Sequence, residues 1–370
     1  MLQIGNKPID TTYVGGKLVQ QVYLGSKKIY PEHGVIPKAI KESMILWYDI
    51  KRQGATNENM ASNPVLRDLS GNGHDATCYN FAWNGMSGVG GYVYDYSKFR
   101  KYQDRATLEI NSTSIRVLSV ISQSAFIESK VSYLPVGTTI QQHKIRVTGL
   151  DAIGIPNINL KVRLGVKFSD NDAFITKDGV YDIPLHTIDG NFNYSISINR
   201  RLEECNVLIE LLPIYPNALV SDGVDDYCLV EGLPLLNKED GFTFIAKRKW
   251  LYLDENSSNT SFITKRKENN EFLKFERYSY ASAYGFIYSF GRGDIINISE
   301  QDIVYCTSIV YQNQAITKGN SDDDIQNVFT IFPADTQRPQ IALCSLLFFN
   351  RDLTTEEIEW VKTNLIETEQ

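Results

Sequence analysis

"LFFNRDLTTEEIEWVK" (Leu347–Lys362) joins an apolar run to the start of a helix. Thr354 is followed three residues later by Glu357, which is the spacing of a capping box at a helix N-terminus. Apolar residues then recur at helical spacing: Ile358, Val361 and Leu365. The stretch therefore predicts a strand followed by one short C-terminal helix that packs on a β structure through its apolar face.

Short strands precede this stretch at regular spacing, and turn residues separate them. Examples are "DGFTFIAKRKW", "YGFIYSFGRG" and "IALCSLLFFN", which are bounded by Gly, Asn, Asp or Pro. The composition agrees, because 21 Tyr, 17 Phe and 25 Gly favour β structure with many turns. We expect an all-β chain built around an antiparallel sandwich or jelly roll.

A different pattern occupies residues 100–216. "NLKVRLGVKF" and "NFNYSISIN" alternate apolar and polar residues over longer runs, as half-buried strands do. We interpret this region as a second β-sandwich inserted into the first. The predicted organisation is a repeat at 1–33, a first jelly-roll segment at 34–99, the insert at 100–216 and a second jelly-roll segment at 217–370. The stretch from "LWYD" to "NFAW" should then pair with strands that follow Asn217.

The chain begins with a short repeat of ten-residue period. Each unit carries a turn dipeptide with glycine first: Gly5-Asn6, Gly15-Gly16 and Gly25-Ser26. Such a β-meander is too small to fold alone. We expect it to dock on another subunit or a larger assembly; packing on this chain's own next domain is the alternative. The docking side chains would be Ile4, Ile9, Tyr13, Leu18, Val22, Tyr23, Ile29 and Tyr30.

The motifs "LWYD", "LRDLSGNGHDAT", "SDGVDDYCLV" and "LFFNRDLTTEEIEWVK", in this order, resemble a concanavalin A-like (laminin G-like) jelly roll. Together with the repeat, they resemble structural proteins of tailed phages that infect gut Bacteroidetes, including crAss-like phages. The resemblance implies a fibre or decoration subunit at the virion surface, assembled in the host cytoplasm. Its partners would be other virion proteins and further copies of itself, with weak binding of host or mucus glycans.

Motifs for catalysis are absent from the sequence. The four histidines show no metal-binding spacing, and there is no G-x-S-x-G elbow or phosphate-binding loop. The alternating carboxylates E-x-D-x-E of glucanases with a concanavalin A-like fold are missing as well. We therefore expect no catalytic residue and no organic cofactor. A bacterial lectin-like module that binds glycans is the alternative function, although the first residues do not read as a signal peptide.

Charge and hydropathy exclude two classes of partner. A net charge of −7 argues against nucleic acid, which needs a basic surface. No apolar run is long enough to span a membrane. The five cysteines are scattered and form no C-x-x-C pair, so we expect free buried thiols.

A few residues could serve a binding site. Asp222, Asp225 and Asp226 form an acidic turn that suits calcium, and a solvated polar turn is the simpler alternative. The same two interpretations apply to Ser321–Asp324. Aromatic side chains that could stack on sugar rings, with core packing as the alternative, are Trp83, Trp250 and Tyr284.

Overall fold

The computed structural model divides the chain into two compact units. The outer unit comprises Met1–Ala55, Asn63–Asn80 and Gly223–Gln370; the inserted unit comprises Thr56–Ser62 and Phe81–Asp222. The structure describes residues 36–129, 135, 137–163, 173–187, 194–233, 243–251, 260–267, 270–280, 283–289, 296–298, 303–307, 328–332 and 340–366, and six strands within residues 3–30. None of the helices in these described ranges has the length and apolarity of a membrane span.

The N-terminal repeat forms three small hairpins. The strands are β1 (Gln3–Ile4), β2 (Lys7–Pro8), β3 (Tyr13–Val14), β4 (Lys17–Leu18), β5 (Val22–Leu24) and β6 (Lys27–Tyr30). In each hairpin the innermost pair leaves two residues between the strands, as the turn dipeptides predict: Ile4↔Lys7, Val14↔Lys17 and Leu24↔Lys27. Each hairpin is a separate two-stranded sheet among the described residues.

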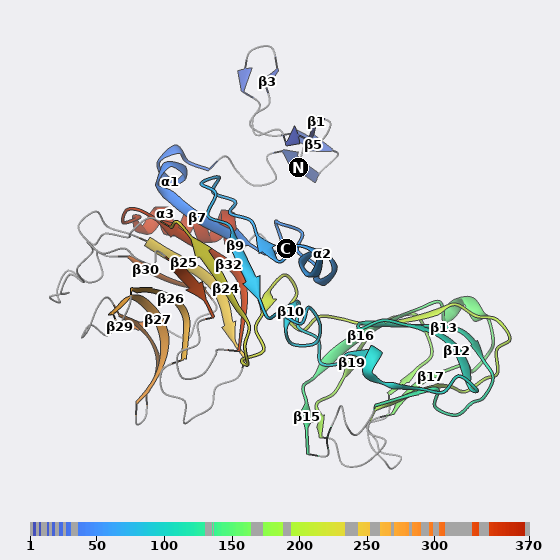
Figure 1. The fold of residues 1–370 in the computed structure, drawn as a ribbon. Helices are drawn as coiled ribbons and strands as arrows, with labels where there is room; N and C mark the ends of the chain where they lie inside the picture. The colour runs from blue at the N-terminus through green and yellow to red at the C-terminus, as the bar shows by residue number, and fades with distance from the viewer. Residues whose placement is uncertain are drawn as a thin grey trace. The chain divides into compact units, whose positions relative to one another are not determined.

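The outer unit contains two antiparallel sheets (Figure 1). The strands that the outer unit contributes to the first sheet have the order β7 (Met44–Asp49), β32 (Ile341–Phe349), β25 (Thr243–Trp250) and β30 (Ile303–Thr307). The second has the order β29 (Ile296–Ile298), β28 (Ala283–Ser289), β27 (Asn270–Tyr280), β26 (Thr260–Lys267), β31 (Val328–Ile331), β24 (Tyr227–Glu231), β9 (Ala76–Tyr79) and β8 (Val65–Leu66). Phe329 on β31 meets Phe348 on β32 edge to face, with ring centroids 5.3 Å apart, so the sheets share a core.

Strand β32 is buried on both faces, which explains its nearly continuous apolar sequence. Phe348 points to the core between the sheets, where it also contacts Phe244. Leu347 and Phe349, its neighbours in sequence, belong to a second cluster under the C-terminal helix. The strand pairs with β7 along one edge and with β25 along the other. The early segment therefore completes a sheet made by the end of the chain, as the sequence predicted.

Two helical segments cover the outer face of this sheet: α1 (Lys38–Ser43), and α3 (Thr355–Val361) continued by the π-helix η4 (Lys362–Ile366) (Figure 1). They bury Ile40, Ile358, Val361 and Leu365 against the strands. The all-β class with a C-terminal helix is confirmed. Helix α1 and, in the inserted unit, α2 (Asn57–Ser62) were not expected, because neither six-residue helix carries a clear apolar stripe.

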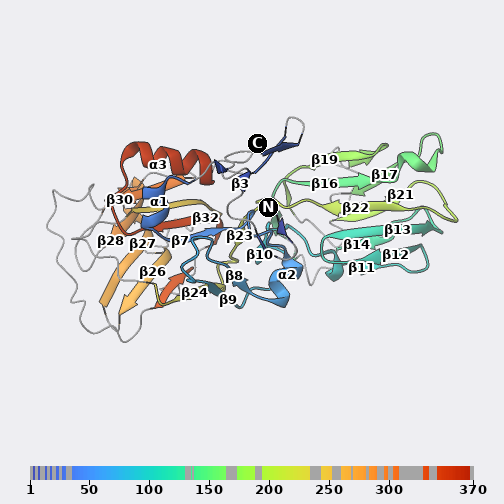
Figure 2. The ribbon, with the colours of Figure 1, turned by 90° about the horizontal axis from the view of Figure 1, so that it is seen from above.

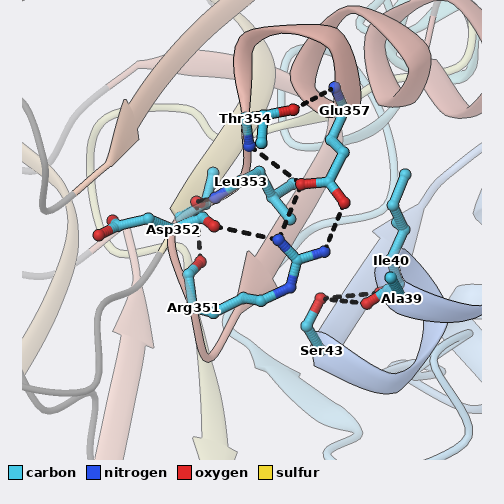
Figure 3. A network of polar contacts seen from close by, with 9 residues as sticks. Ala39, Ile40, Ser43, Arg351, Asp352, Leu353, Thr354 and Glu357 are labelled. Atoms are coloured by element: carbon cyan, nitrogen blue, oxygen red, sulfur yellow. Dashed lines mark hydrogen bonds and ion pairs between the residues drawn. The ribbon is translucent and has the colours of Figure 1, made fainter.

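The predicted capping box is present at the start of α3 (Figure 3). The Thr354 hydroxyl accepts from the Glu357 amide at 3.3 Å, and the Glu357 carboxylate accepts from the Thr354 amide at 3.0 Å. Both oxygens of this carboxylate also accept from the Arg351 guanidinium at 2.7 Å. These hydrogen bonds hold the pKa of Glu357 below its usual range, against partial burial. The turn after β32 is thus fixed by a bidentate ion pair.

The "LRDLSGNGHDAT" motif folds back on β7 through one carboxylate. Asp68 accepts from the backbone amides of Trp47, Ser70 and His74 at 3.0, 2.9 and 3.2 Å. The Asn72 amide group donates to the carbonyl of Met44 at 2.8 Å. The Gly, Asn and Asp residues of the motif therefore tie a tight loop to the first strand, which gives the spacing of this motif a structural reason.

Two cysteines that are far apart in sequence face each other across β9 and β24. Cys78 and Cys228 are direct partners in the antiparallel register, and their sulfur atoms lie 2.9 Å apart. Both thiols are buried, and burial raises the pKa of Cys228. The sequence predicted free buried thiols; Cys78 and Cys228 are free thiols that are buried and form a pair, whereas Cys205 and Cys344 are free thiols that are half-buried. In the sequence, the two paired cysteines flank the main inserted segment, Phe81–Asp222.

The inserted unit is a second β-sandwich (Figure 2). One sheet has the order β11 (Arg100–Lys101), β14 (Ile127–Glu128), β21 (Ser195–Ile198), β17 (Leu160–Arg163) and β18 (Ala173–Ile175). The other has the order β12 (Ala106–Ile110), β13 (Ser114–Val120), β22 (Val207–Leu211), β16 (His143–Thr148) and β19 (Gly179–Ile183). Smaller elements are β10 (Gly88–Val89) paired with β23 (Leu219–Val220), β15 (Thr139–Ile140) paired with β20 (His186–Thr187), and the short 3-10 helices η1 (Tyr96–Lys98) and η2 (Asp151–Ile153).

The inserted unit begins earlier than residue 100 and ends later than residue 216. Tyr94, Tyr96 and Phe99 are buried in its core, where the Tyr96 and Tyr194 hydroxyls lie 3.1 Å apart. Helix α2 also belongs to this unit, since the Asn57 side chain bonds both backbone groups of Val89. The boundaries differ from the expected ones because aromatic residues ahead of the first long strand serve the insert's core.

We predict that a mild disulfide oxidant will cross-link Cys78 to Cys228. Oxidised glutathione would take both thiol hydrogens as two molecules of glutathione, leaving one intramolecular disulfide. Burial slows exchange, so the reaction should need warming to just below the melting transition. Peptide mapping would identify the linked peptides and Cys78→Ser would abolish them. A cross-link from Cys205 or Cys344 instead would contradict the register of β9 and β24.

We predict that Glu357→Gln destabilises the chain by about 1–2 kcal/mol at neutral pH, because it removes the ion pair and weakens the helix cap. The folded pKa of Glu357 is lowered. Its contribution is therefore complete above the unfolded pKa of about 4.3 and lost as pH falls through the folded value. The melting temperatures of the parent chain and of Glu357→Gln should therefore differ at pH 7 and converge as the pH is lowered to 3. Glu359→Gln, on the same helix but in a surface pair with Lys362, is the control and should change little.

Candidate functional site

The acidic turn predicted from the sequence brings three carboxylates together. Oxygen atoms of Asp222, Asp225 and Asp226 all lie within 4.8 Å of one another. Asp225 is exposed, Asp222 is half-buried and Asp226 is buried. The three carboxylates therefore differ in their access to solvent, from the exposed Asp225 to the buried Asp226.

The turn is held against the end of strand β9. The Asn80 amide group donates to the backbone carbonyl of Asp225 at 3.1 Å. Asn80 has a φ of +65°, a left-handed conformation that asparagine tolerates better than most residues. Val224, at the tip of the turn, keeps 73% of its surface exposed. The turn therefore exposes the Asp225 carboxylate and the apolar Val224 side chain to solvent.

A pair of stacked tyrosines lies beside the turn. Tyr79 and Tyr227 are opposite each other at the end of the β9–β24 ladder, with ring centroids 5.0 Å apart and planes inclined by 15°. Tyr79 is 40% exposed. The sequence did not reveal this pair, because it depends on the register of two strands that the insert separates. Only the alternation in "DATCYN" and "DDYCLV", with a Tyr beside each Cys, could have suggested it.

We refer to the residues Tyr79, Val224, Asp225 and Tyr227, all of which are at least partly exposed, as the contact surface of the outer unit. Aromatic rings stack on the apolar faces of sugars, and carboxylates accept hydrogen bonds from hydroxyl groups. Converging carboxylate oxygens are also the ligands that a hard cation such as Ca²⁺ prefers. The arrangement can therefore bind a hydroxyl-rich ligand directly or through a cation.

Of the three side chains predicted to stack on sugars, only that of Trp83 lies within the described residues. Trp83 is half-buried in the inserted unit, stacks on Phe81 at 5.0 Å and has a φ of +54°, which is rare for a bulky residue. Trp250 ends β25 and Tyr284 lies in β28, and their side chains are outside the described residues. Ser321–Asp324 also lies outside them.

Seven of the eight predicted docking residues lie on the strands of the N-terminal hairpins; Ile9 is outside the described residues. The side chains of the hairpins are not described. The placement follows the sequence pattern, with Ile4 and Tyr13 on the first strands of their hairpins and Leu18 and Ile29 on the returning strands.

The largest pKa shifts among the described residues belong to core groups. Burial raises the pKa of Tyr48, Tyr96 and Tyr194 well above the usual range. These hydroxyls lie in the cores of the two units. Such shifts reflect packing, and they do not mark a general acid or base in a cleft.

Comparison with known proteins gave no family model and no curated protein that matches the chain. Similar solved structures include Trypanosoma rangeli sialidase, with 11% identity over 71% of this chain and 63% of the sialidase, at a TM-score of 0.31. A mutant of that sialidase displaying trans-sialidase activity gives 13% identity over 42% of this chain and 29% of its own, at a TM-score of 0.32. The chain thus spans less than two thirds of either sialidase.

A tandem CBM22 domain from Paenibacillus barcinonensis Xyn10C matches more weakly, with 8% identity over 72% of this chain and 99% of its own, at a TM-score of 0.17. Scores this low carry no information on activity or ligands.

Proposed function

We propose that this chain is a non-enzymatic structural subunit of a tailed phage particle, a fibre or decoration protein of head or tail. Its N-terminal repeat would attach it to other virion proteins or to further copies of itself. The contact surface of the outer unit would bind host or mucus glycans weakly. The virion surface is the corresponding location, with assembly in the host cytoplasm.

The observation that carries the attachment role is the isolation of the three N-terminal hairpins. Each forms a sheet of only two strands among the described residues. A single two-stranded hairpin is at best marginally stable in water. Three such hairpins at a ten-residue period, rich in apolar residues, gain stability when another protein surface covers them.

Glycan contact is supported by the stacked tyrosines and the acidic turn beside them. A single shallow site of this kind would bind with Kd near millimolar, about −4 kcal/mol. Several copies on one particle would raise the effective affinity without any new contact. A bacterial lectin-like module could use the same surface, but it would have no need of a docking repeat, and attachment therefore separates the two functions.

We predict that deletion of residues 1–33 leaves both sandwiches folded and prevents incorporation into particles. Circular dichroism would check folding, and mass spectrometry of purified particles would measure incorporation. A matched control keeps the length and composition of residues 1–33 but scrambles their order; it should also fail to incorporate. Normal incorporation of the deleted chain would show that attachment lies elsewhere and would favour the lectin-like alternative.

We predict that a streptavidin-tetramerised form of the chain binds neutral glycans on an array of capsule and mucin sugars. The double substitution Tyr79→Ala and Tyr227→Ala should abolish this binding, whereas Tyr181→Ala, a half-buried tyrosine of the inserted unit, should not. Arrays read with calcium and with EDTA would show whether the acidic turn acts through a cation. Silence across the array would remove the glycan role, and released reducing ends would overturn the non-enzymatic assignment.

A further inference from the structure

A basic segment lies at the edge of the inserted unit. Strand β11 is the last strand of its sheet and pairs only with β14 among the described residues. Within eight residues the segment carries four cationic side chains: Lys98, Arg100, Lys101 and Arg105. Three of these are exposed and Arg105 is half-buried, in a chain whose net charge is −7. The cations therefore form a local patch of opposite sign to the chain as a whole.

Two guanidinium groups of this patch share one aromatic ring. The Arg105 guanidinium carbon lies 3.8 Å from the centre of the Tyr102 ring, and that of Arg100 lies 4.6 Å from it. The electron-rich face of a tyrosine attracts cations. Both guanidinium carbons therefore lie 4.6 Å or less from one ring centre, and an anion bound beside the ring would be attracted by both cations.

One of the two guanidinium groups is fixed in place. Arg105 donates from Nη1 to the backbone carbonyl of Ala125 at 2.7 Å. Its backbone is also held, since its amide donates to the Tyr102 carbonyl at 3.0 Å. A guanidinium has five N–H donors, so most of them remain for a ligand. Ordering before binding lowers the entropy cost of holding an anion.

Glu128, the acid nearest to Arg100 in the strand register, forms a hydrogen bond with another residue. Glu128 is the direct register partner of Arg100 across β11 and β14 and is buried. Its carboxylate accepts a hydrogen bond from the Tyr102 hydroxyl. Among the described residues no carboxylate lies within ion-pair distance of Arg100 or Arg105, whereas Arg116 and Arg146 of the other sheet pair with Glu109 and Glu210.

We propose that Arg100, Tyr102 and Arg105 bind the carboxylate of an acidic saccharide, a uronate or a sialate. Planar guanidinium groups match a carboxylate with two parallel hydrogen bonds. The proposal goes beyond the neutral-glycan contact of the outer unit, although it rests on the same proposed role in surface attachment. Binding is weak for one copy, strengthened by several copies, and sensitive to salt because the patch is exposed.

Basic side chains on an edge strand have a simpler use, which is to prevent pairing with the edge of another sheet. That role needs only the charge, and it is insensitive to the shape of the cationic group. Recognition of a carboxylate needs the fork of arginine. Lysine substitutions therefore separate the two roles.

The test uses the full-length tetramerised chain on immobilised oligogalacturonate and oligosialate, with dextran as the neutral polymer and polyglutamate as the acidic peptide. We expect the double variant Arg100→Gln and Arg105→Gln to bind the acidic sugars at least about tenfold more weakly. The double lysine variant should lose most of this binding. Arg146→Gln, which removes an arginine that already has a carboxylate partner, should bind as the parent does. Unchanged melting temperatures would exclude misfolding.

The two acidic sugars distinguish the two kinds of carboxylate: binding of oligogalacturonate alone would identify a uronate as the ligand, and binding of oligosialate alone would identify a sialate. Equal binding of polyglutamate would overturn the saccharide assignment. Full binding of the acidic sugars by the lysine variant would exclude specific carboxylate recognition by arginine and would favour the simpler role of preventing pairing between sheet edges. The neutral array with Tyr79→Ala and Tyr227→Ala is independent of this patch. If the chain binds neutral glycans but no acidic sugar, only the present proposal fails. If it binds acidic sugars but no neutral glycan, the neutral-glycan role fails and the present proposal is supported.

Discussion

The pairing of β7 with β32 is the constraint on which the outer unit depends. Strand β32 is buried on both faces, so it can lie only in the interior of a sheet with a core on each side. Phe348 fills the core between the sheets, while Leu347 and Phe349 carry the C-terminal helix. Strand β7 lies along one edge of β32, and the loop organised by Asp68 is tied to β7. The first and last segments of the unit therefore form one cooperative structure.

The insertion is tolerated because it leaves and re-enters the outer unit at adjacent strands. Tyr79 ends β9 and Tyr227 begins β24, and the two residues are register partners. A long insertion between neighbouring positions adds little to the entropy of closing the loop. The same geometry creates the contact surface, since the stacked tyrosines and the acidic turn exist only where the two strands meet. The pairing of β9 with β24 therefore both accommodates the insertion and forms the candidate binding surface.

Local chemistry made some of this structure predictable. The Thr354–Glu357 spacing specified a helix start, and the three turn dipeptides specified the hairpins, because both depend on residues a few positions apart. Contacts between distant segments were less accessible. The Cys78–Cys228 pair, the Tyr79–Tyr227 stack and the guanidinium groups over Tyr102 depend on register or on the path of a turn. The acidic turn was found since its members are adjacent, but burial of Asp226 is a tertiary property.

Strand order also has a consequence for synthesis on the ribosome. Strand β7 ends at Asp49 and its partner β32 begins at Ile341, about 300 residues later. At roughly 5–20 residues per second, the apolar segment "MILWYD" waits on the order of 15–60 s for its partner. Both five-stranded sheets of the inserted sandwich emerge during that interval, so this unit can fold first. Strand β7 is therefore synthesised early but paired last. Its apolar side chains have most need of chaperones before β32 leaves the ribosome.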